Sequence, residues 1–154
     1  ITGPIQANYK KKIQKKIQLF DMESHVQIKK SLNRNKKIDY YKNADLFILP
    51  SYEEGDSVAL KEALASYLPV IISKQCRMNI VEEYDAGYVI DTNVESLKNG
   101  LMKAYDSLNH LDRMGQNSRK LIEENYNNKE CVGRLLDIYL DIHSNKKISK
   151  SWLS

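Results

Sequence analysis

The segment at 46–62 constrains the fold of this chain more than any other. It opens with the apolar run 46–49, which is typical of a strand buried on both faces of a sheet. A polar turn with Gly55 follows, and a helix is predicted from about 57 to 67, with Asp56 or Ser57 as its N-cap. A strand whose carboxyl end leads into a helix forms the usual ligand-binding edge of an open α/β sheet. The free amides of the first helical turn favour anions such as phosphate there.

Short apolar runs alternate with helical patterns along most of the remaining chain. The sequence predicts strands at 25–28, 69–73 and 88–90, a polar loop at 33–37, and helices at 9–20, 38–44, 78–84, 94–108, 111–125 and 129–143. This alternation predicts a parallel sheet with helices on both faces, which is a Rossmann-like, three-layer α/β/α architecture. A Rossmann dehydrogenase is disfavoured because no Gly-x-Gly-x-x-Gly turn follows any predicted strand.

The length of 154 residues suits one domain, which we predict at 1–144, followed by a polar tail at 145–154. Because the chain begins with Ile1 rather than Met, we expect a piece of a longer protein, lacking the first strand and helix of its domain. No apolar run approaches the roughly 20 residues of a membrane span. Cys76 and Cys131 form no paired-spacing motif, so a reducing, cytoplasmic setting is expected. The net charge of +4 does not indicate a dedicated nucleic-acid surface.

Two glutamates flank the turn, and both could reach a ligand bound at the start of the helix. Glu54 lies at the end of the strand, and Glu62 lies one helical turn after Val58. Helical side chains lean toward the N-terminus, so Glu62 can reach back to the first turn. On spacing alone, solvated charges beside a tight turn are the simpler interpretation. The functional alternative is a site in which both carboxylates and the amides of residues 56–58 converge on one small ligand.

Several short motifs follow one another in order. They are Ala44-Asp45 before the first buried strand, Pro50-Ser51 after it, Glu54-Gly55, Ser57, Glu62-Ala63, Pro69-Val70-Ile71-Ile72-Ser73, Gln75-Cys76, Ala86-Gly87, Met114-Gly115 with Asn117 and Arg119, and Tyr139. In this order and spacing, residues 38–140 resemble the carboxyl-terminal, nucleotide-sugar-binding domain of a family 4 (group 1) glycosyltransferase, which is one half of the two-domain GT-B fold.

The resemblance implies a donor-sugar site and the roles of its residues. Glu54 would be the catalytic residue, binding a hydroxyl of the donor sugar near the reacting carbon, and Glu62 would bind the ribose hydroxyls. Backbone amides of Asp56, Ser57 and Val58 would cradle the sugar and diphosphate. The donor-binding set of the motif is Ser51, Gly55, Asp56, Ser57, Val58 and Glu62. Family members retain the anomeric configuration and generally need no metal, so neither a metal nor another cofactor is expected.

The resemblance also implies partners outside this segment. They are a nucleotide-sugar donor, an acceptor-binding amino-terminal domain and an acceptor for polysaccharide or glycolipid synthesis. Without that domain the segment is expected to be inactive. Asp56 stands where relatives carry an aromatic residue, and its negative charge would repel the diphosphate unless it is turned away or caps the helix. A degenerate, non-catalytic binding module is therefore the alternative function.

The other polar features have two interpretations each. The three histidines lack metal-ligand spacing and are expected to be surface residues. Cys76 is either a plain structural thiol or part of the acceptor side of the cleft. The lysines at 10–16 form a basic amphipathic segment with Ile13 and Ile17. Such a segment is either a solvated face or a contact with an anionic membrane. The membrane contact would lie on the inner face of the cell membrane, where lipid-linked acceptors reside.

Overall fold

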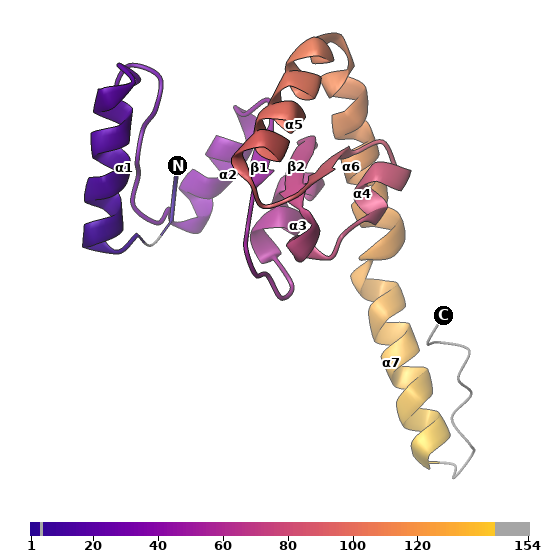
Figure 1. Ribbon diagram of the computed structural model, residues 1–154. Helices are drawn as coiled ribbons and strands as arrows, with labels where there is room; N and C mark the ends of the chain where they lie inside the picture. Colours follow the sequence, from indigo (N-terminus) through magenta and orange to yellow (C-terminus); the bar gives the residue numbers. More distant parts are fainter. Residues whose placement is uncertain (4, 144–154) are drawn as a thin grey trace. The chain divides into compact units, whose positions relative to one another are not determined.

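The computed structural model describes residues 1–3 and 5–143 (Figure 1). Their contacts divide the chain into two compact units, 1–43 and the residues from Ala44 onward, and each unit is described by itself. The single domain expected at 1–144 stays a prediction, and the tail expected at 145–154 lies outside the described residues. In order along the chain, the elements are α1 (Ala7–Leu19), α2 (Arg34–Lys42), β1 (Phe47–Leu49), α3 (Val58–Ala65), β2 (Val70–Ser73), the 3₁₀ turn η1 (Lys74–Cys76), α4 (Ile80–Glu83), β3 (Gly87–Ile90), α5 (Val94–Asp106), the 3₁₀ turn η2 (Leu108–His110), α6 (Leu111–Asn125) and α7 (Asn128–His143).

The first unit consists of α1, α2 and the extended segments beside them. The strand predicted at 25–28 is wrong, because the pairing there is a single parallel bridge between Thr2 and Lys29. Residues 1–3 offer too short a partner for a ladder, and the amide of Lys29 donates to the Ile1 carbonyl at 2.8 Å. The loop predicted at 33–37 is also wrong. The side chain of Asn33 accepts a hydrogen bond from the Lys36 amide at 3.0 Å, and this cap starts α2 at Arg34.

The second unit contains the predicted parallel sheet, with strand order β1-β2-β3. Phe47 is opposite Val70, and Val70 is opposite Gly87. All four residues of β2 are buried. β1 was expected to be buried on both faces, but Ile48 is 40% exposed. Among the described residues β1 pairs with β2 alone, so it forms one edge of the sheet.

Helices cover both faces of this sheet, as the three-layer prediction required. On one face, Val70 and Ile72 pack in a core cluster with Leu60 and Leu64 of α3 and Leu121 of α6. On the other face, Ile71 packs with Ile90 and with Ala104 of α5. The alternation of β2 side chains between the two clusters is what a period of two in a strand dictates.

Three predicted helices are shorter than expected, and one of them, predicted at 94–108, ends at Asp106. The helix predicted to reach 67 ends at Ala65, because Tyr67 adopts a left-handed conformation with φ of 63°. The helix predicted at 78–84 begins at Ile80 and ends at Glu83. By contrast, α6 has the predicted bounds, and its amphipathic pattern places Met114 and Leu121 in the interior.

Glycines occupy the two closest backbone contacts of the second unit. A Cβ at Gly87 would lie 2.0 Å from the Val70 carbonyl oxygen, and one at Gly115 would lie 2.3 Å from the Tyr67 carbonyl oxygen. The first contact joins neighbouring strands, and the second joins α6 to the turn after α3. Both contacts are with backbone, so neither can be relieved by a rotamer change.

Gly87→Ala should therefore lower the free energy of unfolding by about 2 kcal/mol or more, because the β2–β3 spacing must open. The matched control is Gly133→Ala in α7, where an added Cβ meets nothing within 4 Å and where alanine favours the helix. Urea denaturation of both variants measures the difference. Equal stability of the two variants would contradict the assigned contact between β2 and β3.

Candidate functional site

Two side chains, one at the end of β2 and one in η1, tie this region to the end of β1 and to the loop that follows it. The Ser73 hydroxyl donates to the Ser51 carbonyl at 2.6 Å, and the Cys76 thiol donates to the Leu49 carbonyl at 3.6 Å. Both Ser73 and Cys76 are buried. These bonds join the carboxyl ends of two adjacent parallel strands, which is where open α/β sheets place their ligands. The sequence places Ser73 at the end of the motif Pro69-Val70-Ile71-Ile72-Ser73 but assigns it no role in the site.

The Glu54 carboxylate is positioned by the same loop. The Ser51 hydroxyl donates to Glu54 Oε2 at 3.0 Å, and the Glu54 side chain is half-buried. This bond occupies one carboxylate oxygen. Ser51 therefore links the end of β2, through its carbonyl, to the predicted catalytic carboxylate, through its hydroxyl.

Ser57, rather than Asp56, is the N-cap of α3. Ser57 is only 8% exposed, and its hydroxyl accepts a hydrogen bond from the Leu60 amide at 3.4 Å. Asp56 instead forms an ion pair with Lys61, with 2.5 Å between Oδ1 and Nζ. The Asp56 side chain is 75% exposed, so the pair is a surface interaction with little effect on stability. The Lys61 ammonium does, however, balance the negative charge of Asp56 beside the loop.

The start of α3 is exposed on the side of Val58, whereas Leu60 of the same turn is buried. Gly55 does not use the left-handed region, and a Cβ added to it would meet nothing within 4 Å. Val58, the first residue of the helix, is 65% exposed. A glycine in such a turn can serve either for close backbone approach or for a positive φ, and Gly55 has an accessible backbone without a positive φ. A ligand can therefore approach the amides at the start of α3.

Glu62 lies in the second turn of α3 and is half-buried. It follows Val58 by four residues and so stands one turn further along the same side of the helix. Its backbone carbonyl accepts hydrogen bonds from the amide and the hydroxyl of Ser66, the latter at 2.8 Å. The structure thus brings Ser51, Glu54, Asp56 and Ser57 together in one loop. It places Glu62 on the helix that this loop begins.

The described residues contain neither a candidate metal cluster nor a membrane-spanning helix. Across residues 1–3 and 5–143, no group of three or more His, Cys, Asp and Glu side chains is close enough to hold a metal ion. No helix within the same residues has the length and apolar character needed to cross a membrane. The expectation that the chain uses no metal and no other cofactor stays a prediction.

Known proteins match both the sequence and the structure. The family described as "Glycosyl transferases group 1" matches residues 1–121. The UDP-Gal:alpha-D-GlcNAc-diphosphoundecaprenol alpha-1,3-galactosyltransferase of Escherichia coli is 34% identical over 116 residues, which cover 73% of this chain and 30% of that enzyme. The chain thus spans under a third of the length of this relative.

Solved structures agree with the fold. A sucrose-phosphate synthase from Thermosynechococcus elongatus aligns with a TM-score of 0.76 and 18% identity, covering 90% of this chain and 35% of the other. WaaG, a glycosyltransferase involved in lipopolysaccharide biosynthesis, aligns with a TM-score of 0.68 and 22% identity over 79% of this chain and 32% of that one. The fold is the Rossmann-like α/β fold found in one half of GT-B glycosyltransferases. The chain belongs to the group 1 glycosyl transferase family.

The hydrogen bond from Ser73 to Ser51 gives a test of the site's framework. Ser73→Ala leaves the Ser51 carbonyl without this donor, and we expect a loss of about 1–2 kcal/mol in the free energy of unfolding. Ser66→Ala is the control, because the Ser66 hydroxyl donates to a carbonyl that already accepts an amide of α3. Chemical denaturation should show the larger loss for Ser73→Ala. A loss no greater than that of the control would show that the bond does not hold the loop.

Proposed function

We propose that this chain is the donor-binding domain of a retaining glycosyltransferase, which moves a sugar from a nucleotide-sugar to an acceptor in polysaccharide or glycolipid synthesis. The observation that carries the proposal is the uncovered start of α3 at the carboxyl edge of a parallel sheet, with the Glu54 carboxylate fixed beside it by Ser51. Family membership supports the same reaction class.

The groups around the turn suit the parts of such a donor. Amides of Asp56, Ser57 and Val58 stand at the positive end of the α3 dipole and bind the sugar and diphosphate. Glu54 accepts a hydrogen bond from a hydroxyl of the donor sugar near the reacting carbon. Glu62 accepts hydrogen bonds from the ribose hydroxyls. Each carboxylate is thus assigned to neutral hydroxyl donors and not to the phosphates, which would repel it.

The charge of Asp56 does not exclude this assignment. Lys61 lies 2.5 Å from the Asp56 carboxylate and balances its charge. The cap position belongs to Ser57, so the amide at the third residue of α3 is satisfied without Asp56. Asp56 is therefore a paired, exposed side chain, and its charge is not an obstacle to this assignment.

In the proposed reaction the acceptor hydroxyl forms a new bond to the anomeric carbon, and the bond from that carbon to the diphosphate oxygen breaks. The acceptor proton passes to the leaving phosphate oxygen, and the configuration is retained. The main contribution to rate is stabilisation of charge on the leaving diphosphate, by the α3 amides and by cationic side chains of the whole enzyme. No metal is required in this scheme.

The E. coli relative suggests the substrates to test first. Its name specifies a UDP-linked galactose as donor and a sugar on a diphospholipid as acceptor. We extend these classes to this chain, with a UDP-hexose as donor and a lipid-diphosphate-linked sugar as acceptor. The acceptor side is assigned to the remainder of a longer enzyme.

Nucleotide titration tests the donor site directly. Amide chemical shifts at 54–62 should move when UDP is added to the chain, with GDP and ADP as comparisons. Glu62→Ala should weaken UDP binding about tenfold or more, since it removes a charged acceptor from the ribose. Glu53→Ala is the matched control, because Glu53 is an exposed carboxylate in the same loop to which no role is assigned. A silent titration at millimolar nucleotide would instead favour the non-catalytic binding module.

Steady-state kinetics of the complete enzyme separates the two glutamates. Glu54→Gln should lower kcat about 100-fold with a small change in donor KM, because its contact is strongest when the anomeric carbon is reacting. Glu62→Gln should mainly raise the donor KM, by about tenfold. Glu53→Gln serves as the control and should leave both constants unchanged. Wild-type transfer by both the Glu54 and Glu62 variants would refute the assignment.

A further inference from the structure

The first unit carries a concentrated positive charge that the proposed donor site does not use. Residues 1–43 contain eleven Lys and Arg against three Asp and Glu, a net charge of +8, whereas the rest of the chain has a net charge of −4. Five of these lysines lie in α1 within seven residues. The charge of this segment is therefore much larger than the net charge of the whole chain indicates.

Four of the five α1 lysines share one exposed side of the helix. At 3.6 residues per turn they lie on the side of the helix away from Ile13 and Ile17, which are half-buried. We call this side the basic face; its lysines are Lys11, Lys12, Lys15 and Lys16, and all four are exposed. Leu19 lies on the same side of the helix.

The basic face is unfavourable for an isolated helix. Lys11 and Lys12 stand four residues before Lys15 and Lys16, so like charges face one another along α1. The first turn of α1 contains no acidic residue, and no residue of the helix is fully buried. Throughout residues 1–3 and 5–143, no ion pair involves a lysine of the basic face. An external anion would supply the compensation that this part of the chain does not contain.

Apolar side chains are exposed at the end of the same helix. Leu19 is 75% exposed, Phe20 is 67% exposed and Met22 is 40% exposed, and we call these three the apolar tip. A soluble polyanion would be bound by the lysines alone and would leave the tip in water. A lipid surface accommodates both features, because the apolar side chains enter the headgroup region while lysines contact acidic phospholipids.

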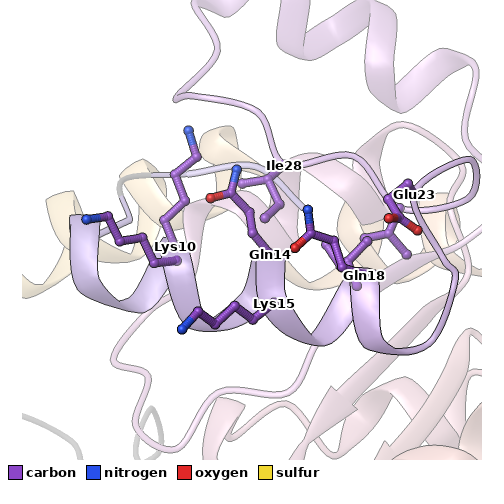
Figure 2. Close-up of a pocket in the computed structure, with 9 residues that line it drawn as sticks. Lys10, Gln14, Lys15, Gln18, Glu23 and Ile28 are labelled. Carbon is purple, nitrogen blue, oxygen red and sulfur yellow. The ribbon is translucent and has the colours of Figure 1, made fainter.

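A hollow of about 490 Å³ runs beside α1. Lys11 and Lys15 of the basic face line it, and Val26 and Ile28 of the extended segment form part of its apolar wall. Figure 2 shows Gln14 of α1 beside Ile28, with Glu23, from the turn after α1, near Gln18. The ammonium groups of Lys10, Lys11 and Lys15 outnumber the one carboxylate in this lining, that of Glu23, so the hollow suits a phospholipid headgroup with the start of its acyl chains.

We propose that α1 is a membrane-docking helix, which binds anionic phospholipid bilayers through the basic face and the apolar tip. Binding is electrostatic at long range and is completed by shallow insertion of Leu19 and Phe20. The proposal uses residues of the first unit, whereas the proposed donor site uses residues of the second, so each can be tested independently of the other. It selects the membrane interpretation of the lysine segment over that of a solvated face.

Vesicle co-sedimentation tests the docking surface with the chain as it stands. The chain should bind phosphatidylcholine vesicles that contain phosphatidylglycerol much more tightly than pure phosphatidylcholine vesicles, and added salt should weaken the binding. K12Q/K16Q should reduce the partition coefficient by about 25-fold, at roughly fivefold for each lysine near an anionic surface. K98Q/K103Q is the matched control, since it removes the same charge from α5 and should change partitioning less than threefold. Circular dichroism confirms that each variant is folded.

A second variant separates a bilayer from a soluble polyanion. L19S/F20S should weaken vesicle binding about tenfold or more while leaving heparin binding unchanged, because only a bilayer receives the apolar tip. The proposal is overturned if K12Q/K16Q binds acidic vesicles like wild type or if pure phosphatidylcholine is bound equally well. It is also overturned if L19S/F20S binds both vesicles and heparin like wild type, since the occupant would then be a soluble polyanion.

Discussion

The second unit depends on the burial of β2. Its four residues are all inaccessible, with Val70 and Ile72 on one face and Ile71 on the other, so this short strand belongs to both core clusters. Burial of apolar surface is the main favourable contribution to folding. In this unit, much of the buried apolar surface involves the four residues of β2, which lies between two parallel strands. The close approach of Gly87 to Val70 follows from the same arrangement, because a central strand pairs with a neighbouring strand on each edge.

The loop of the candidate site is held in place by hydrogen bonds that begin at the end of β2. Ser73 ends β2 inside the core and donates to the loop after β1, and that loop in turn holds Glu54 through Ser51. The loop therefore does not need a regular structure of its own to position a carboxylate. Polar groups at the ends of buried strands are a common way to place functional side chains on a fixed framework. The exposed start of α3 at Val58 and the fixed carboxylate are the two features that suit a nucleotide-sugar donor.

The charges of the chain are divided between its two units. The residues from Ala44 onward have an excess of acidic groups, and the first unit has a net charge of +8. Neither value is visible in the overall net charge of +4. A donor with a diphosphate needs local cations and amides rather than a positive domain, so the acidic unit is compatible with the proposed site. The lysines of α1 serve a different anion in our proposal.

Much of the second unit was predictable because its signals are local. The apolar runs before Pro50 and after Pro69, the Ser57 cap and the amphipathic pattern of α6 each lie within one element. The order of the motifs from Ala44-Asp45 to Met114-Gly115 added the family, and with it the parallel sheet and the expected site residues. The strand expected at 25–28 failed because a strand depends on a partner, and residues 1–3 supply only one bridge.

By itself, then, the amino-acid sequence determined which segments become strands and helices around Gly55 and which side chains surround that turn. Only the tertiary structure decided how those side chains are used. The Ser73–Ser51 bond joins residues 22 positions apart, and the Asp56–Lys61 pair depends on how the loop enters α3. It also decided that Ile48 stays exposed while every residue of β2 is buried. Periodicity and capping act over a few neighbouring residues, whereas strand order and loop contacts depend on packing between segments that are distant along the chain.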